Sequence, residues 1–288
     1  MYAFEMEHVC KRYDGFALQD LTLRLPSGCI LGLVGENGAG KSTTLKLLMD
    51  AIRRDSGTVR VLGTDNQSPE FFALKEDIGI VLDEACFPVL LTARQIGRMM
   101  RYTYKRWDDA CYAGYLRRFE LPENKPFHQF SRGMKMKLAL AVALSHSPRL
   151  LVLDEATGGL DPIVRDEILD IFLEFTRDEG HSVLLSSHIV SDLEKVCDYI
   201  AFLHKGRLWF FEEKDRLYEE YGLVNGTAAQ LDALAAAAPQ AVVQREDGKY
   251  GAKALVRRAA MPAGQTELPV ERTSIEEIIL MMVKGGRE

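Results

Sequence analysis

Two features of the sequence predict an α/β fold with a mixed, largely parallel sheet. Short apolar runs suited to buried strands alternate with segments whose apolar residues recur at helical spacing. That alternation is typical of a parallel sheet covered by helices on both faces. In addition, a glycine-rich turn at residues 35–42 separates an apolar run from a helical segment. A strand, a glycine-rich turn and a helix in that order are what a phosphate-binding loop requires.

The first third of the chain predicts several strands and one helix. Residues 2–7 and 21–25 alternate apolar and polar side chains, and residues 29–34 form a short apolar run suited to a buried strand. After the glycine-rich turn, four apolar residues recur at helical spacing: Leu45, Leu48, Met49 and Ile52. A break at residues 56–57 then leads to another expected strand at residues 58–63.

Helices dominate the middle of the chain, and we expect a helical subdomain at about residues 88–146. Its helices are expected at residues 93–104, 108–119 and 133–145. After Pro148, the apolar run at residues 150–156 predicts a buried strand. A helix over residues 162–179 and another buried strand over residues 182–188 are expected to follow.

The character of the sequence changes around residue 225. Beyond it come an alanine-rich segment, a hairpin pattern, a turn-rich stretch and a closing amphipathic helix. The apolar face of that helix is expected to hold Ile275, Ile278, Ile279 and Met282. We therefore expect one domain over residues 2–225 and a small α+β accessory region over residues 226–288.

Composition limits the classes of function open to this chain of 288 residues. A formal net charge of −6 gives no basic excess of the kind that duplex-binding proteins carry, so we expect no nucleic-acid partner. The five cysteines are scattered and never paired as Cys-x-x-Cys, which argues against a zinc site and favours a reducing cytoplasm. The N-terminus lacks a signal-peptide pattern, and the apolar stretches are too short to span a bilayer. Any membrane association is expected to come through a partner.

The glycine-rich turn fits the phosphate-loop pattern G-x-x-x-x-G-K-[ST]. It consists of Gly35, Glu36, Asn37, Gly38, Ala39, Gly40, Lys41 and Ser42, followed by Thr43. The glycines let backbone N–H groups converge on phosphates, and the following helix adds its positive N-terminal dipole. Lys41 is expected to reach the β- and γ-phosphates of ATP, and the Ser42 hydroxyl to bind Mg²⁺. A chance glycine-rich turn is the alternative, against which the flanking strand and helix weigh.

An acidic pair, Asp154 and Glu155, follows the expected buried strand at residues 150–153. Downstream of a phosphate loop, Asp154 is expected to hold Mg²⁺ and Glu155 to orient and polarise the attacking water. Taken alone, such a pair is more often a solvated strand end. The phosphate loop upstream changes that interpretation.

Taken together, these residues resemble the ATP-binding cassette (ABC) ATPases over about residues 2–225. Residues 130–141, FSRGMKMKLALA, resemble the family signature, which is usually LSGGQ followed by a helix. Residues 158–161, GGLD, resemble the D-loop, and residues 186–188, SSH, resemble the strand end that carries the switch histidine. Tyr13 precedes the phosphate loop where the family keeps an aromatic that stacks on adenine. Five elements in the family's order are far more specific than any one of them.

The resemblance implies that two cassettes close head to tail, with each ATP between one phosphate loop and the signature of the partner. Ser131, Arg132 and Gly133 would then form a second anion site at the start of a helix, which serves the nucleotide of the other cassette. His188 would reach the γ-phosphate and Asp161 would act at the dimer interface. Each also has a plainer interpretation: Tyr13 as packing, His188 as an ordinary hydrogen-bonded histidine and Ser131 as a helix cap.

The chain departs from the family pattern in two places. In the signature, Arg132 replaces the first glycine and Met134 the glutamine, and Arg132 either contacts the nucleotide of the partner or faces solvent. In addition, Asp83 stands where the family usually places a glutamine that touches Mg²⁺ and the attacking water. We expect Asp83 to keep a metal-sensing role.

The resemblance implies an ATP-hydrolysing subunit that powers an ABC transporter, with export favoured over import because the departures resemble bacterial single-cassette exporter ATPases. The expected partners are an integral membrane permease and a second cassette, in a homodimer or a heterodimer, at the cytoplasmic face of the membrane. A soluble ABC ATPase that acts on ribosomes or DNA is the alternative. Such proteins carry two cassettes or long coiled-coil insertions, which this sequence lacks. A P-loop GTPase fits less well, because no N-K-x-D motif is present.

Overall fold

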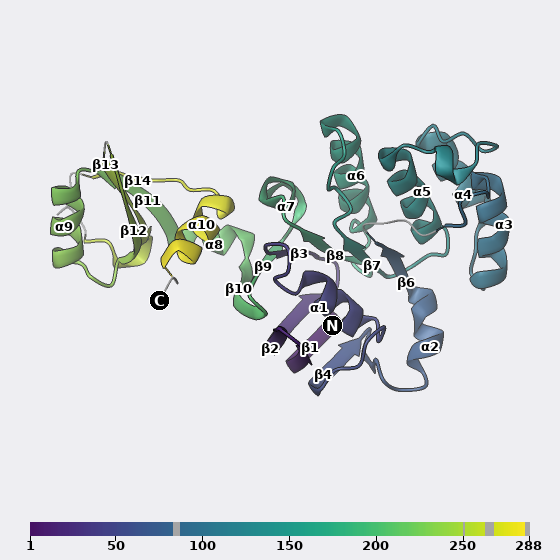
Figure 1. Ribbon diagram of the computed structural model, residues 1–288, viewed down its shortest axis with the longest axis horizontal. Coiled ribbons are helices and arrows are strands. Elements are labelled where there is room, and N and C mark those ends of the chain that lie inside the picture. The colour runs from purple at the N-terminus through teal and green to yellow at the C-terminus, as the bar shows by residue number, and fades with distance from the viewer. Residues whose placement is uncertain (83–86, 250, 263–267, 286–288) are drawn as a thin grey trace. The chain divides into compact units, whose positions relative to one another are not determined.

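The computed structural model describes residues 1–82, 87–249, 251–262 and 268–285. The chain divides into two compact units, Met1–Phe211 and Glu212–Glu288 (Figure 1). The boundary expected at residue 225 would instead cut through β11 (Tyr221–Gly226), which pairs with β13 (Gly251–Arg257) inside the second unit.

A four-stranded antiparallel sheet of the first unit has the order β2-β1-β4-β5. Its strands are β1 (Tyr2–Tyr13), β2 (Phe16–Pro26), β4 (Ser56–Val61) and β5 (Thr64–Asp65). Leu21, Leu23 and Leu25 of β2 are buried while the residues between them are exposed, as expected for a strand with one covered face. The strands expected at residues 2–7, 21–25 and 58–63 all belong to this sheet.

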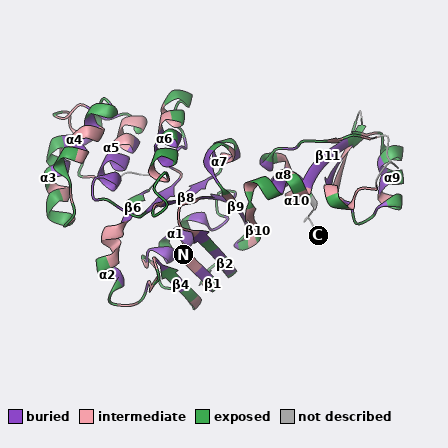
Figure 2. Cartoon of the chain, turned by 180° about the vertical axis from the view of Figure 1, so that it is seen from behind, coloured by how far each residue is buried: buried purple, intermediate pink, exposed green. Residues whose placement is uncertain are grey.

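The second sheet carries the buried strands of the fold, in the order β10-β9-β3-β8-β7-β6. Its strands are β3 (Ile30–Val34), β6 (Ile78–Val81), β7 (Leu150–Asp154), β8 (Ser182–Ser187), β9 (Tyr199–His204) and β10 (Arg207–Glu213). Parallel pairing joins β6 to β7, β7 to β8, β8 to β3 and β3 to β9. Every residue of β3, β7 and β8 is buried, which Figure 2 shows in purple. The carboxyl ends of these strands therefore meet at one edge of the sheet.

Seven α-helices are described in the first unit. They are α1 (Lys41–Leu48), α2 (Phe71–Leu74), α3 (Ala93–Thr103), α4 (Asp109–Arg118), α5 (Arg132–Leu144), α6 (Pro162–Phe175) and α7 (Val190–Val196). Three of them fill the expected helical subdomain, where the Tyr112 hydroxyl of α4 donates to the Ala93 carbonyl of α3 at 2.8 Å. Helix α6 ends at Phe175, before the expected residue 179, and the Asp178 carboxylate accepts the Gly180 N–H at 2.9 Å in the turn that follows.

The second unit holds a four-stranded antiparallel sheet in the order β12-β13-β11-β14. Besides β11 and β13 it contains β12 (Val242–Gly248), β14 (Val270–Glu271), α8 (Lys214–Glu220), α9 (Ala228–Ala237) and α10 (Ile275–Gly285). Helix α10 buries Ile275, Ile278, Ile279 and Met281, so Met281 takes the buried position expected for Met282. No helix in the described part of the chain is both long and apolar enough to cross a membrane.

Candidate nucleotide-binding site

The glycine-rich loop connects the carboxyl end of β3 to the first residue of α1, as the sequence predicts. Gly38 and Gly40 have φ values of 83° and 113°, which side-chain-bearing residues rarely adopt. A Cβ atom on Gly35 would lie 2.5 Å from the Leu203 carbonyl oxygen, so only glycine fits there. The loop therefore wraps tightly around a hollow at the edge of the sheet.

That hollow is a cavity of about 550 Å³ at the start of α1. It is lined by Gly15, Phe16, Glu36, Asn37, Gly38, Gly40, Lys41, Ser42, Thr43, Asp154 and Glu155. Gly35 and Ala39, the other expected loop residues, lie behind its wall, where Ala39 is buried in the core. The phosphate loop and the acidic pair thus share one cavity, beside the positive end of a helix dipole.

Lys41 places its ammonium inside the loop. The residue is only 5% exposed, and its Nζ donates to the carbonyl oxygens of Gly35 at 2.7 Å and Glu36 at 3.4 Å. The same Nζ lies 3.1 Å from Oε1 of Glu155, an ion pair without hydrogen-bond geometry. A buried ammonium needs such partners to offset its lost hydration. It is therefore held at the point where the loop and the acidic pair meet.

The acidic pair stands on a strained piece of backbone at the end of β7. Asp154 is 9% exposed, and its Oδ1 accepts a hydrogen bond from the Ser186 hydroxyl at 2.5 Å. Glu155 has a φ of 53°, in the left-handed region that non-glycine residues seldom adopt. Its backbone N–H donates to the Ser186 carbonyl at 3.0 Å. Strain held in place by such bonds is common at functional sites.

His188 completes the group from the neighbouring strand end. Its side chain is 51% exposed, and Nδ1 lies 2.6 Å from Oε2 of Glu155. Glu155 thus bridges Lys41 and His188, with one carboxylate oxygen toward each. Glu155 and His188 directly follow β7 and β8, which are parallel neighbours, so their contact follows from the pairing of these strands.

The residues of the expected second anion site lie outside the cavity. Ser131 and Asp161 cap α5 and α6, with their side-chain oxygens accepting the N–H of Met134 at 3.2 Å and of Val164 at 3.1 Å. Within a single chain, Ser131 therefore acts as a helix cap, which is the plainer of its two interpretations. Both residues are exposed, as is Arg132, while Gly133 is half-buried.

Arg132 also packs within its own chain. A Cβ atom on Gly159 would lie 2.8 Å from Nη1 of Arg132, so the guanidinium covers the start of the GGLD segment. The residues at the starts of α5 and α6 that were expected to bind ATP do not line the cavity that contains Lys41 of the same chain.

The aromatic residue that lines the cavity is Phe16, not Tyr13. Tyr13 lies at the end of β1, is 46% exposed and stacks on Phe16 with the ring centroids 6.5 Å apart. Gly15, Phe16 and the Asp154 partner Ser186 were not expected at the site. The only signals for them were the aromatic pair around Asp14-Gly15 and the serines before His188. Asp83 lies outside the described residues.

The cavity residues fit Mg²⁺, which is commonly held by one or two carboxylates together with substrate phosphates. Ser42 and Asp154 present hard oxygen donors to the same cavity. Oε1 of Glu155 is buried and accepts no hydrogen bond, although it is ion-paired with Lys41.

Comparisons with known proteins show the family of this chain. Residues 18–158 match a family model described as ABC transporter. The chain is 32% identical over 219 residues to the ABC transporter ATP-binding protein YtrB of Bacillus subtilis (strain 168), covering 75% of this chain and 74% of the relative. It is 30% identical over 240 residues to the bacitracin transport ATP-binding protein BcrA of Enterococcus faecalis, covering 79% of this chain and 77% of the relative.

A solved ATP-binding subunit of an ABC transporter has the same fold. It superimposes with a TM-score of 0.67 and 27% identity, and covers 75% of this chain and 91% of that one. The resemblance drawn from the sequence motifs and the predicted fold class are thereby confirmed. The chain belongs to the ABC transporter family, as an ATP-binding and ATP-hydrolysing subunit.

Proposed function

We propose that this chain drives an exporter by pairing with a second cassette around ATP and docking on a separate membrane permease. The observation that carries the proposal is the Glu155 carboxylate, held between the Lys41 ammonium at 3.1 Å and the His188 imidazole at 2.6 Å. A carboxylate fixed on both sides beside a phosphate loop is placed to orient a water molecule rather than to act as a surface charge.

Each residue of the cavity has a separate task in this proposal. Lys41 binds the β- and γ-phosphates and neutralises charge that develops on them, and the loop N–H groups share that task. Glu155 accepts a proton from the attacking water, while His188 holds the carboxylate and contacts the γ-phosphate. Ser42 and Asp154 hold Mg²⁺, which supplies further charge neutralisation when bound. Asp83 is proposed to sense the same ion.

The second cassette is needed because part of the expected site faces away from the cavity. Ser131 and Gly133 begin α5, and Asp161 begins α6, at helix starts whose N–H groups favour anions. They do not line the cavity of their own chain. A second copy, or a different cassette, would bring these helix starts to the exposed side of the bound ATP.

The permease is proposed to contact exposed apolar side chains of the first unit. Between residues 72 and 102 the chain exposes several large apolar side chains: Phe72, Ile80, Leu82, Val89, Leu90 and Tyr102. The relative BcrA is named for bacitracin transport, and that likeness supports a transport role for this chain. The chain would then lie on the cytoplasmic face of the membrane.

The substitution Glu155→Gln tests the proposed chemistry. It removes the proton acceptor but keeps the side-chain shape, so ATP hydrolysis is expected to fall about 10²–10⁴-fold while ATP binding persists. The variant is expected to accumulate as an ATP-bound dimer in size-exclusion chromatography. Isolated from its host, it should bring down an integral membrane protein and no nucleic acid.

The matched control is Glu174→Gln, which neutralises another ion-paired glutamate, the partner of Arg118. That control is expected to hydrolyse ATP at the wild-type rate. Hydrolysis by Glu155→Gln at the wild-type rate would remove Glu155 from its proposed role.

A further inference from the structure

The second unit contains a sheet whose two faces differ in chemistry. On one face, the buried residues Val224, Ala252, Ala254 and Val256 pack with Leu231 and Leu234 of α9. Because side chains alternate along strands, the neighbours of these residues point to the opposite face. There the apolar pair Leu223 and Leu255 is followed two residues along each strand by Asn225 and Lys253.

A row of polar side chains therefore crosses three strands of this face. Asn225 of β11 is paired with Lys253 of β13, and Lys253 is paired in turn with Glu246 of β12. Charged residues on the covered face of a sheet are costly unless they are paired or serve a ligand. The row is thus a departure from the apolar pattern of the rest of the sheet.

The charged side chains of the row form ion pairs with residues of α10. Nζ of Lys253 lies 2.7 Å from Oε1 of Glu277 and 3.4 Å from Oε2 of Glu246, and Lys284 hydrogen-bonds the other oxygen of Glu246. The Lys284 and Lys253 ammoniums hold the pKa of Glu246 below its usual value, and Glu277 raises the pKa of Lys253. Both shifts favour the charged forms of Glu246 and Lys253.

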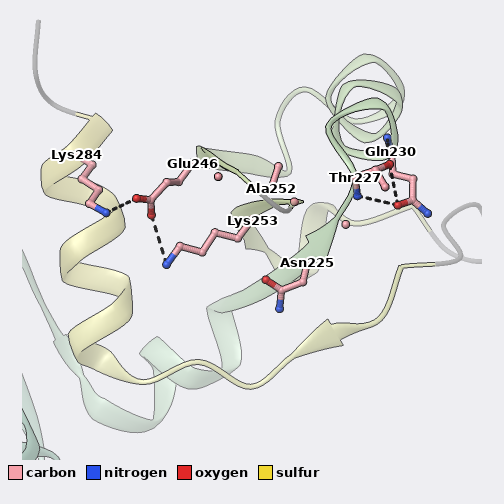
Figure 3. Close-up of a pocket in the computed structure, with 10 residues that line it drawn as sticks. Asn225, Thr227, Gln230, Glu246, Ala252, Lys253 and Lys284 are labelled. Carbon is pink, nitrogen blue, oxygen red and sulfur yellow. Dashed lines mark hydrogen bonds and ion pairs between the residues drawn. The ribbon is translucent and has the colours of Figure 1, made fainter.

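A hollow of about 730 Å³ opens beside this row (Figure 3). Its size lies within the range of small-molecule sites. Gly226, Gly248 and Gly251 contribute no side chain to its wall, at the ends of three neighbouring strands. Lys284, Glu246 and Lys253 line one end, while Thr227 and Gln230 line the other, with Asn225 between them (Figure 3). The charged end is thus separate from the uncharged polar end.

Groups of both signs line the charged end, joined by ion pairs to one another. Oε2 of Glu246 is buried and accepts no hydrogen bond, with the Lys253 ammonium 3.4 Å away. An ammonium offers three N–H donors, more than the partners found for Lys253 or Lys284 in the described part of the chain. A zwitterion could exchange with the Glu246–Lys253 pair, its ammonium beside Glu246 and its carboxylate on the lysines.

We propose that this hollow binds a small zwitterion, a free amino acid or a short peptide, with its ammonium on Glu246 and its carboxylate on Lys253 and Lys284. Uncharged parts of the zwitterion extend along the glycine wall toward Asn225, Thr227 and Gln230. The site lies wholly in the second unit and is separate from the nucleotide cavity. It does not rest on the proposed export function.

The test is binding to the full-length protein by isothermal titration calorimetry, with triglycine and the twenty free amino acids as probes. Triglycine carries both charges, N-acetyl-triglycine lacks the ammonium and triglycine amide lacks the carboxylate. We expect saturable binding of triglycine or of at least one amino acid. The probe that binds shows whether the ligand is a short peptide or a free amino acid. For the probe that binds, removal of either charge is expected to weaken affinity at least about tenfold, because each contact is charge-assisted.

Two variants assign the contacts. Glu246→Gln is expected to lower the affinity for the zwitterion at least about tenfold and not to weaken binding of the form without an ammonium. Lys284→Met, in the exposed last turn of α10, is expected to lower the affinity for the zwitterion to a similar extent and not to weaken binding of the form without a carboxylate. This variant provides the test if Glu246→Gln folds poorly.

Asp232→Asn is the matched control, since this exposed carboxylate pairs with Arg245 in the same unit and does not line the hollow. Its affinity should equal that of the wild type. The proposal is overturned if no probe binds the wild type, if the derivatives that keep only one charge bind as well as the zwitterion, or if the control weakens binding as much as the two variants.

Discussion

The Ser186 hydroxyl holds the Asp154 carboxylate in place, and its removal tests the proposed metal site. Its Oγ donates to Oδ1 of Asp154 at 2.5 Å, and both residues are buried. Ser186→Ala therefore leaves a buried carboxylate oxygen without its donor. The free energy of unfolding should fall by about 1.5–3 kcal/mol, the range for a hydrogen bond to a charged group. Loss of a partner that orients a metal ligand commonly costs about 10–100-fold in metal affinity.

The assay is the rate of ATP hydrolysis as a function of Mg²⁺ concentration. For Ser186→Ala we expect the Mg²⁺ concentration that gives half the maximal rate to rise about 10–100-fold. Ser182→Ala is the matched control, because Ser182 is a buried serine at the other end of β8 whose Oγ accepts the Gly28 N–H at 3.0 Å. It should lose stability without a change in Mg²⁺ dependence.

Two results would refute this reasoning. An unchanged Mg²⁺ requirement in Ser186→Ala would show that the hydrogen bond does not prepare Asp154 for a metal. An equal rise in both variants would show that loss of stability, rather than the orientation of Asp154, causes the effect.

Two further predictions concern the helical subdomain and its connection to the sheet. Gly97→Ala should lower the free energy of unfolding by about 1–3 kcal/mol in urea titrations, since the new Cβ would lie 2.4 Å from the Tyr112 ring. A gain in stability, as helix propensity alone predicts, would contradict that contact. Burial lowers the pKa of His146, whose ring stacks on Tyr104. The neutral imidazole therefore stabilises the folded state above the ordinary histidine pKa of about 6.5. That contribution is lost as the pH falls through the lower pKa of the folded state. His146→Gln should flatten the loss of unfolding free energy below that pH, and an unchanged pH profile would contradict the assignment.

Much of the nucleotide site could be predicted from the sequence, because its motifs are local. The loop from Gly35 to Ser42 depends on glycine conformations and on a helix that begins at Lys41, which neighbouring residues determine. The buried strands were also recognisable, since strands covered on both faces are continuous apolar runs. Their order in the sheet was not predictable in the same way.

Contacts across strands required the tertiary structure. Ser186 faces Asp154 because β7 and β8 are parallel neighbours in a register that pairs these two residues. Phe16, the first residue of β2, lines the cavity, whereas Tyr13 at the end of β1 does not. Neither fact follows from spacing along the chain.

The sequence by itself determined the α/β class and the phosphate loop, because short-range sterics and apolar periodicity depend on neighbouring residues, and the resemblance of its motifs indicated the family. Only the tertiary structure decided the boundary before β11, the Lys41–Glu155–His188 contacts and the polar row through Lys253. Those features depend on strand order and register, which are set by the packing of segments far apart in the chain.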